Sequence, residues 1–147
     1  MTEDVGVADE SQGRVVRVEH GWCLVALDLS IIRARCVLPV AVGDWVQLSD
    51  GAEPGVRTIA ERHSALTRLD PSGLTQVLAA NVDVVLVTAP ADRLSAARIE
   101  REVAMGWDSG AMPVVLLTKA DLDDGTVAAE LAGRLTGVDV LGVSATT

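Results

Sequence analysis

Two hydrophobic patterns divide the chain near residue 70. Before that point, apolar and polar residues alternate in short runs. In GRVVRVEHGWCLVALD, for example, Val16 and Val18 lie opposite Arg17 and Glu19. A period of two residues is typical of a β-strand with one buried face, and the following His-Gly pair is a suitable hairpin turn. The pattern predicts five short strands, at residues 13–19, 22–28, 31–40, 43–50 and 55–69.

Five short strands within residues 13–69 predict a small β-barrel. We expect an OB-fold, which is a five-stranded barrel, although an SH3-like barrel would give a similar pattern. The next segment, DPSGLTQ at residues 70–76, gathers Asp, Pro, Ser and Gly, which are typical of a connection. We therefore predict a linker at residues 70–76 and a second domain at residues 77–147.

The second domain has the pattern of an α/β fold. Residues 82–90, VDVVLVTAP, form a continuous apolar run, as expected for a strand buried on both faces of a parallel sheet. Further strands are predicted at residues 112–118 and 138–145. Amphipathic helices are predicted between the strands. Their apolar stripes are Ala96, Ile99, Val103 and Trp107 in the first helix and Val127, Leu131 and Leu135 in the second.

The starts of these helices carry acidic residues. Asp92 is a suitable N-cap for a helix that begins near Arg93. Asp123 and Asp124 suit the positive end of the second helix dipole. The order β-α-β-α-β predicts parallel strands with right-handed crossovers.

Composition excludes several classes of protein. The net charge is −9, and residues 1–12 are acidic and lack periodicity, which predicts a flexible tail rather than a signal peptide. No apolar run is long enough to span a membrane. Cys23 and Cys36 lack the spacing of metal ligands, and we expect two buried thiols. We predict a cytoplasmic protein, with no metal site in these residues.

The candidate chemistry lies where the predicted parallel strands end. In such sheets, ligands bind beyond the carboxyl ends of the strands. Thr118, Lys119, Ala120 and Asp121 follow one strand, and the pair Ser144-Ala145 ends the next. A carboxylate at Asp121 can accept two parallel hydrogen bonds from N1 and the 2-amino group of guanine.

The neighbouring residues can complete such a site. The alkyl stem of Lys119 can lie along the base, and a backbone N–H of the Ser-Ala pair can donate to guanine O6. Adenine lacks the 2-amino group and would leave the carboxylate unpaired. The alternative, which stays open at this point, is a solvated turn that only begins a helix.

The residues that would bind phosphate are not in this sequence. A phosphate loop of the form G-x-x-x-x-G-K-[ST] needs a lysine, and Lys119 is the only lysine of the chain. No G-x-G-x-x-G motif follows a strand either, which argues against a dinucleotide-binding enzyme. We expect the phosphate loop beyond residue 147, so that the motifs of a GTPase would run in permuted order.

At this point the sequence resembles the circularly permuted ribosome small-subunit-dependent GTPase A (RsgA) family over residues 13–147. The resemblance rests on the motifs GRVVRVEHGWCLVAL, VGDWVQL, LTR, QVLAANVDVVLVTA, MPVVLLTKADL and GVSA. The stretch QVLAANVD, residues 76–83, is the most distinctive of these, because generic GTPases do not share it.

The resemblance implies an OB-fold that contacts 16S ribosomal RNA, a permuted P-loop GTPase domain with a three-layer α/β architecture, and a zinc-binding domain. It implies a monomeric factor in late maturation of the small (30S) ribosomal subunit that hydrolyses GTP. The corresponding GTP-binding residues are Thr118, Lys119, Ala120, Asp121, Ser144 and Ala145. The magnesium and zinc ligands would lie beyond residue 147, so this fragment should be inactive alone. The family usually has asparagine in place of Thr118, whose single hydroxyl anchors the loop less well.

The barrel carries the candidate RNA contacts, Arg14, Arg17, Arg33 and Arg35, which can neutralise phosphates. One alternative is a non-enzymatic RNA-binding OB module with an α/β docking domain. A second alternative is a Rossmann-like metabolic enzyme with catalytic groups at residues 88–92.

Overall fold

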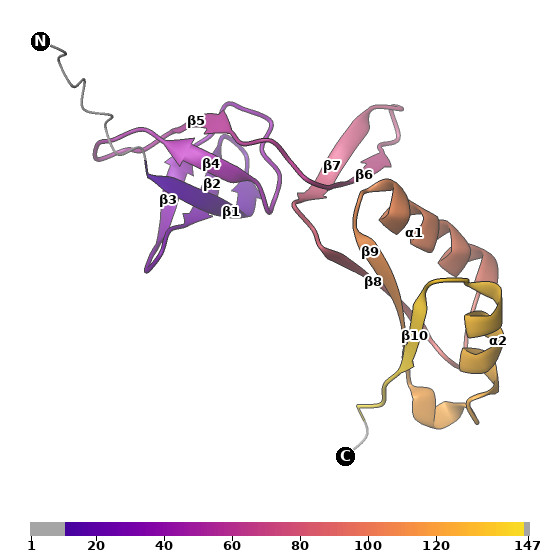
Figure 1. Cartoon of the computed structure of the whole chain (residues 1–147). Coiled ribbons are helices and arrows are strands. Elements are labelled where there is room, and N and C mark those ends of the chain that lie inside the picture. The colour runs from indigo at the N-terminus through magenta and orange to yellow at the C-terminus, as the bar shows by residue number, and fades with distance from the viewer. Residues whose placement is uncertain (1–10, 146–147) are drawn as a thin grey trace, which may run out of the picture. The chain divides into compact units, whose positions relative to one another are not determined.

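The computed structural model describes residues 11–145, which divide into two compact units. The first, which we call the barrel unit, extends to Asn81, and the second, the α/β unit, begins at Val82. Figure 1 shows the elements of both units along the chain. Residues 1–10 of the predicted acidic tail lie outside the described residues, and Gln12, the last residue of that prediction, begins the first strand.

The barrel unit contains a five-stranded sheet with the order β3-β2-β1-β4-β5. Its strands are β1 (Gln12–Glu19), β2 (Trp22–Ala26), β3 (Ile31–Arg35), β4 (Trp45–Leu48) and β5 (Val56–Ile59). Neighbouring strands are antiparallel, and a parallel bridge between Arg35 and Gly55 joins the two edges of the sheet. Closure between the third and fifth strands gives an OB-type barrel, as predicted.

Alternate residues of the strands fill the barrel. The buried core comprises Val15, Cys23, Val25, Ala34, Cys36, Val46, Leu48 and Val56. The prediction for β1 was wrong in one respect, because Val16 and Val18 are 41% and 44% exposed. The pairing of β1 with β2 shifts between Val15 and Arg17. Such a bulge puts an extra residue into the strand and changes which side chains face inward.

The predicted fifth strand, residues 55–69, is two strands. β5 ends at Ile59, and the chain then leaves the barrel sheet. β6 (Ala65–Leu69) pairs with β7 (Thr75–Ala80) as a separate antiparallel hairpin. The polar run at residues 61–64, ERHS, interrupts the alternation at this break, so the sequence carried a signal that the prediction of one strand overlooked.

The predicted linker, residues 70–76, covers the turn of this hairpin and the first residues of β7. Asp70 builds the turn, because its Oδ1 accepts hydrogen bonds from the backbone N–H groups of Ser72 (2.8 Å) and Leu74 (3.0 Å). The Ser72 hydroxyl also donates to Oδ1 at 2.6 Å, and this bond is the main cause that lowers the pKa of Asp70.

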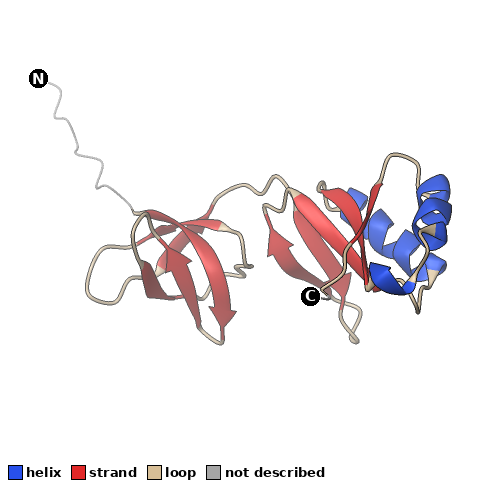
Figure 2. Cartoon of the chain, turned by 90° about the horizontal axis from the view of Figure 1, so that it is seen from below, coloured by secondary structure: helices blue, strands red, loops and turns tan. Residues whose placement is uncertain are grey.

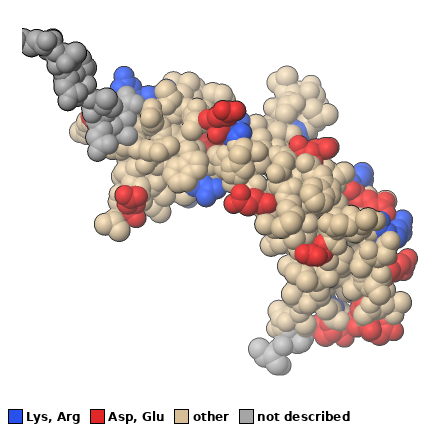
Figure 3. Space-filling view, viewed as in Figure 1, with Lys and Arg blue, Asp and Glu red and all other residues tan. Residues whose placement is uncertain are grey.

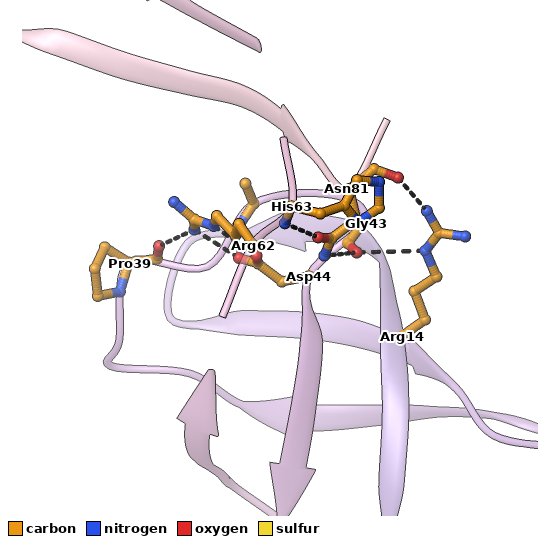
Figure 4. Close-up of polar contacts among 8 residues, drawn as sticks. Arg14, Pro39, Gly43, Asp44, Arg62, His63 and Asn81 are labelled. Carbon is orange, nitrogen blue, oxygen red and sulfur yellow. Dashed lines mark hydrogen bonds and ion pairs between the residues drawn. The ribbon is translucent and has the colours of Figure 1, made fainter. Parts of the chain in front are cut away.

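A buried polar cluster ties the end of the hairpin to the barrel (Figure 4). Asn81 donates from Nδ2 to the Gly43 carbonyl at 2.9 Å, and its Oδ1 accepts the His63 N–H at 3.0 Å. Gly43 has φ 96°, and a Cβ built on it would lie 2.0 Å from the Ala80 carbonyl oxygen. Only glycine allows this close approach of two backbones.

Asp44 is the buried charge of the same cluster, with 0% of its surface exposed. Arg62 donates from Nε to Oδ1 and from Nη2 to Oδ2, both at 2.7 Å. The Ala41 N–H also donates to Oδ2 at 2.7 Å. The bond to Asp44 raises the pKa of Arg62 further above its ordinary value, so the guanidinium stays charged.

The α/β unit is built on a parallel sheet with the order β10-β9-β8. Its elements are β8 (Val84–Pro90), α1 (Ala96–Asp108), β9 (Met112–Thr118), the short 3₁₀ helix η1 (Ala120–Leu122), α2 (Thr126–Arg134) and β10 (Asp139–Gly142). The β-α-β-α-β order and the parallel sheet are as predicted.

The helix starts differ in part from the prediction. Ser95, not Asp92, caps α1, and its hydroxyl accepts a backbone N–H of the first turn at 3.4 Å. Asp123 and Asp124 lie before α2 as predicted. Their carboxylates accept backbone N–H groups at the helix start, including that of Thr126 at 3.0 Å. These bonds satisfy donors that have no partner within the helix.

The buried face of α1 turns one residue away from the predicted stripe. Ile99, Val103 and Gly106 are buried, whereas Trp107 is 49% exposed. A Cβ on Gly106 would lie 2.9 Å from Cβ of Pro113 in β9, so the glycine lets the helix approach the sheet closely. The hydrophobic pattern predicted that Trp107 faces the sheet. The short distance between α1 and β9 instead requires the small Gly106 at that position.

Both helices cover the same face of the sheet (Figure 2). One core joins them to it, made of Val87, Ala89, Ala91, Ile99, Val103, Val115, Leu117, Leu131 and Leu135. The expectation that the first strand is buried on both faces was wrong for these residues, since Val84 and Leu86 of β8 are 43% and 58% exposed. Residues 82–145 therefore form two layers, the sheet and the helices on one of its faces, and not the three of the predicted architecture.

Candidate functional site

The ends of β9 and β10 meet at the carboxyl edge of the parallel sheet. β10 pairs with β9 in register, with Gly142 opposite Leu117. Beyond the paired strands, the Val143 N–H donates to the Leu117 carbonyl at 2.8 Å, and the Ala120 N–H donates to the Val143 carbonyl at 3.0 Å. Backbone hydrogen bonds thus hold the two loops that carry the predicted residues side by side.

Asp121 and Ser144 are in direct contact at this edge. The Ser144 hydroxyl donates to Asp121 Oδ1 at 2.6 Å, across 23 positions of sequence. Asp121 lies in η1, the single turn that follows β9, and both residues are exposed. An ionised carboxylate has about four acceptor positions, so this bond orients Asp121 and leaves acceptor capacity for a ligand.

Lys119 sets the direction of the loop. Its backbone is left-handed, with φ 54° and ψ 40°, which is uncommon for a residue with a side chain. The conformation costs about 1–2 kcal/mol and turns the chain from β9 directly into η1. Left-handed non-glycine residues cluster at functional sites, and no sequence pattern indicated this one.

Thr118 connects the loop to the third strand tip. Its carbonyl accepts the Ala91 N–H at 2.9 Å, which extends the pairing of β8 with β9 by one bond. The Rossmann-like alternative requires catalytic groups in this segment. Asp92 there lies 4.0 Å from Arg93, and with side chains 32% and 78% exposed this is a weak surface pair.

Two of the four predicted barrel arginines contact one aromatic ring, and a third is linked to them by a carboxylate. Arg33 and Arg35 of β3 place their guanidinium carbons 4.2 Å and 5.6 Å from the ring centroid of Trp22 in β2. Arg17 of β1 joins them through Glu19, whose carboxylate lies 3.4 Å from Arg17 and 3.9 Å from Arg33. We call these five residues the Trp22 cluster.

Arg14 has a different environment. Its Nη2 and Nε donate to the carbonyls of Asn81 at 3.1 Å and Gly43 at 3.3 Å. Its guanidinium carbon also lies 5.7 Å from the ring centroid of Trp45. The side chain therefore supports the buried polar cluster and is not part of the Trp22 cluster.

The remaining candidate groups are structural. Among residues 11–145, no group of three or more His, Cys, Asp or Glu side chains is placed to hold a metal ion. Cys23 and Cys36 are buried free thiols, as predicted, and burial raises the pKa of Cys23 to about 11. No helix in the described part of the chain is long and apolar enough to cross a membrane.

Sequence reasoning missed the Asp44–Arg62 pair and the role of Asn81. A signal was available for Asp44, because alternate residues Val46 and Leu48 of the same strand face the core. Extending that alternation by one step puts Asp44 inside the barrel, where a carboxylate needs a charged partner. The partner lies 18 positions away along the sequence and could not be identified from it.

Solved structures share the arrangement of an OB-type barrel followed by a parallel α/β unit. The structure of YloQ, whose title gives it as a circularly permuted GTPase, matches with a TM-score of 0.68 at 20% identity, over 98% of this chain and 55% of that one. YjeQ from Thermotoga maritima matches with a TM-score of 0.62 at 20% identity, over 90% of this chain and 52% of that one. These likenesses establish the fold.

The sequence comparisons identify the family. The model of the RsgA GTPase family matches residues 59–147. The small ribosomal subunit biogenesis GTPase RsgA of Streptomyces coelicolor is 43% identical over 150 residues, which cover 90% of this chain and 41% of that protein. Its counterpart in Streptomyces avermitilis is 42% identical over 149 residues, covering 90% and 40%.

The chain belongs to the RsgA GTPase family, as the sequence motifs predicted. It spans about two fifths of the length of the curated relatives that it matches.

Proposed function

We propose that the carboxyl edge of the parallel sheet binds the guanine base of GTP. The observation that carries this proposal is the 2.6 Å hydrogen bond from Ser144 to Asp121, which fixes a carboxylate at the edge where ligands of such sheets bind. Asp121 accepts N1–H and N2–H of the base with its remaining lone pairs. Charge-assisted pairs of this kind are strong and selective.

The neighbouring residues complete the base site. The stem of Lys119 covers one face of the base, and a backbone N–H of Ser144 or Ala145 donates to O6. Ala120 holds the two loops together through its hydrogen bond to the Val143 carbonyl at 3.0 Å. Thr118, which stands where the family usually has asparagine, ties the loop to β8 through its backbone carbonyl.

The whole protein is proposed to hydrolyse GTP to GDP and phosphate. In phosphoryl transfer most of the rate enhancement comes from the phosphate loop and magnesium. The only lysine of this sequence is Lys119, so these residues contain no G-x-x-x-x-G-K-[ST] loop. We propose that other residues of the full-length protein supply this loop, together with the magnesium and zinc ligands that the family resemblance implies. The 147-residue chain itself is proposed to bind the base and to be inactive in hydrolysis.

The proposed partner is the small ribosomal subunit, because the matched RsgA proteins are named as its biogenesis GTPases. The barrel would contact 16S ribosomal RNA, with arginine side chains against phosphates. We propose that the protein acts as a monomer in the cytoplasm. Figure 3 shows acidic side chains spread over the face in view, so RNA contact requires local basic sites such as the Trp22 cluster.

Replacement of Asp121 by asparagine in the full-length protein tests the base site. Asparagine presents an amide in place of one acceptor oxygen, so GTP affinity should fall by about 10- to 150-fold, which corresponds to the roughly 1.5–3 kcal/mol of a hydrogen bond to a charged group. Affinity for xanthosine triphosphate, which has an acceptor in place of the 2-amino group, should rise. Unchanged discrimination between these nucleotides, or against ATP, would refute the assignment.

The matched control for Asp121→Asn is Asp108→Asn at the end of α1, which should leave nucleotide affinity unchanged.

Two further measurements, of hydrolysis and of RNA binding, distinguish the alternatives. Single-turnover assays of the 147-residue chain should give no GTP hydrolysis, and measurable turnover would contradict the proposal. A full-length protein that binds RNA but no guanine nucleotide would instead be the non-enzymatic RNA-binding module.

A further inference from the structure

The Trp22 cluster lies on the outer face of the barrel because of strand register. Arg17, Leu24 and Arg33 are cross-strand neighbours on β1, β2 and β3, and so are Glu19, Trp22 and Arg35. Residues directly opposite in adjacent strands point to the same face. These two adjacent rows therefore bring three guanidinium groups and one indole ring together.

Stability does not require this arrangement. The side chains of Arg17 and Arg33 are 68% and 57% exposed, and their distances to Glu19 are 3.4 Å and 3.9 Å. Exposed pairs of this kind contribute about 0–1 kcal/mol. Three arginines against one glutamate give the cluster a local charge of +2 on a chain whose net charge is −9.

The stacked geometry is the informative feature. The guanidinium carbon of Arg33 lies 4.2 Å from the ring centroid of Trp22, within the range of a cation–π contact. A guanidinium is planar and the Arg33 side chain is 57% exposed, so a second planar group can reach it. Arg17 and Arg35 lie beside it as charged donors.

We infer that the Trp22 cluster is a binding platform for an unpaired RNA nucleotide. The inference rests on the proposed contact of the barrel with RNA and assigns its chemistry. The base stacks on the layer formed by Trp22 and Arg33, and the flanking phosphates pair with Arg17 and Arg35. Stacking of bases on aromatic and guanidinium planes is how proteins recognise unpaired RNA.

A double-stranded segment fits this surface less well. In an A-form helix the faces of the bases are covered by their neighbours, so a duplex offers only its phosphates and groove edges. A purely phosphate-binding site needs arginines but has no use for an indole. Glu19 also repels phosphates that approach in a regular row, because it lies beside Arg17 and Arg33.

The test measures binding of labelled ten-nucleotide RNAs to the 147-residue chain by fluorescence anisotropy at several salt concentrations. Trp22→Leu should weaken binding of unpaired RNA on the order of 10-fold, in the range of one stacked base. Trp22→Phe should restore most of the loss. Arg33→Lys keeps the charge but not the plane and should also weaken binding. Arg17→Ala should lower the salt slope by about 1.

Matched controls come from the same chain. Trp45→Leu removes the other barrel tryptophan, whose arginine neighbour is held by backbone carbonyls, and should leave RNA affinity unchanged. Arg93→Ala removes an exposed charge outside the cluster. Circular dichroism and thermal melts check that each variant is folded.

Each outcome decides between interpretations. If unpaired and duplex RNA bind equally and Trp22→Leu has no effect while Arg17→Ala does, the cluster binds phosphates only and the stacking inference is overturned, although RNA binding by the barrel stands. If neither RNA form binds, or if an aspartate decapeptide binds as tightly, the RNA function of the barrel fails as well. Neither result bears on guanine recognition at Asp121, which is measured separately.

Discussion

Replacing Asp44 by alanine removes the only charged acceptor inside the polar cluster of the barrel unit. The carboxylate is 0% exposed and accepts three hydrogen bonds of 2.7 Å, from Nε and Nη2 of Arg62 and from the backbone of Ala41. In the variant, the arginine keeps its charge and the backbone N–H loses its acceptor. Both groups then lie in a space too confined for full hydration.

The cost can be worked from these contacts. Removing one partner of a buried ion pair costs about 3–5 kcal/mol. The Arg62 side chain is 25% exposed and keeps some contact with water, which favours the lower end of the range. An unsatisfied backbone N–H is included in that figure, at about 1–3 kcal/mol. A unit of roughly 80 residues has about 4–12 kcal/mol of stability in total, so a loss near 3 kcal/mol removes between about a quarter and three quarters of it.

Urea unfolding followed by tryptophan fluorescence measures this loss. In a Trp107→Phe background the remaining tryptophans, Trp22 and Trp45, both report on the barrel unit. The midpoint should fall strongly for Asp44→Ala, whereas the exposed control Asp28→Ala should stay within about 0.5 kcal/mol of the parent.

A double replacement separates the ion pair from general packing. Removing Arg62 as well, by Arg62→Met in the Asp44→Ala background, eliminates the unpaired charge. The double variant should therefore lose less than the sum of the two single variants. A loss below about 1 kcal/mol for Asp44→Ala, or strictly additive losses, would show that the pair does not hold the barrel together.

Three further predictions concern other positions. Gly43→Ala should destabilise the barrel unit much more than Gly51→Ala in urea unfolding, because both have positive φ but only the first would meet a backbone oxygen, at 2.0 Å. The thiol of Cys23, whose pKa burial raises to about 11, should resist alkylation at pH 8 in the folded chain and react fast in urea, and equal rates would contradict its burial. Ser72→Ala should raise the pKa of Asp70, because the hydrogen bond from the Ser72 hydroxyl is the largest cause of the lowered value. NMR titration of the Asp70 carboxyl carbon measures this pKa. Since the pKa is lowered in the folded state, the ionised carboxylate stabilises the fold above its unfolded pKa, and this stabilisation is lost as the pH falls through the folded pKa.

Local patterns were sufficient for most of the elements and for the meeting of the two strand ends that carry the candidate residues. Alternation within residues 13–50 predicted four of the five barrel strands, and the long apolar runs predicted β8 and β9 within two residues of their observed starts. The meeting of the residues after β9 with those after β10 was predictable, because parallel topology alone brings the ends of these strands to one edge. Asp121 and Ser144 are 23 positions apart, yet two strand ends and one rule of connection place them together.

The errors arose where contacts between distant segments decide the structure. Packing against Pro113 puts Gly106 rather than Trp107 under α1, and sequence periodicity cannot weigh a close approach against a large side chain. The two ends of the separate hairpin are attached to the barrel by side chains distant in sequence. Before the hairpin, Arg62 binds Asp44. After it, Asn81 accepts the His63 N–H and donates to the Gly43 carbonyl. The left-handed backbone of Lys119 is likewise imposed by the surrounding loops, since lysine has no preference for it.

Hydrogen bonds join Ala120 to Val143 and Ser144 to Asp121. Through them, binding of a ligand at Asp121 is coupled to the ordering of the segment after β10. If a base binds Asp121 as proposed, it should stabilise the conformation in which the Ser144 hydroxyl contacts Asp121. By reciprocity, anything that immobilises the segment after β10 should then tighten base binding by the same free energy. Amide hydrogen exchange at residues 143–145 should therefore slow on nucleotide binding and report site occupancy without any measurement of turnover.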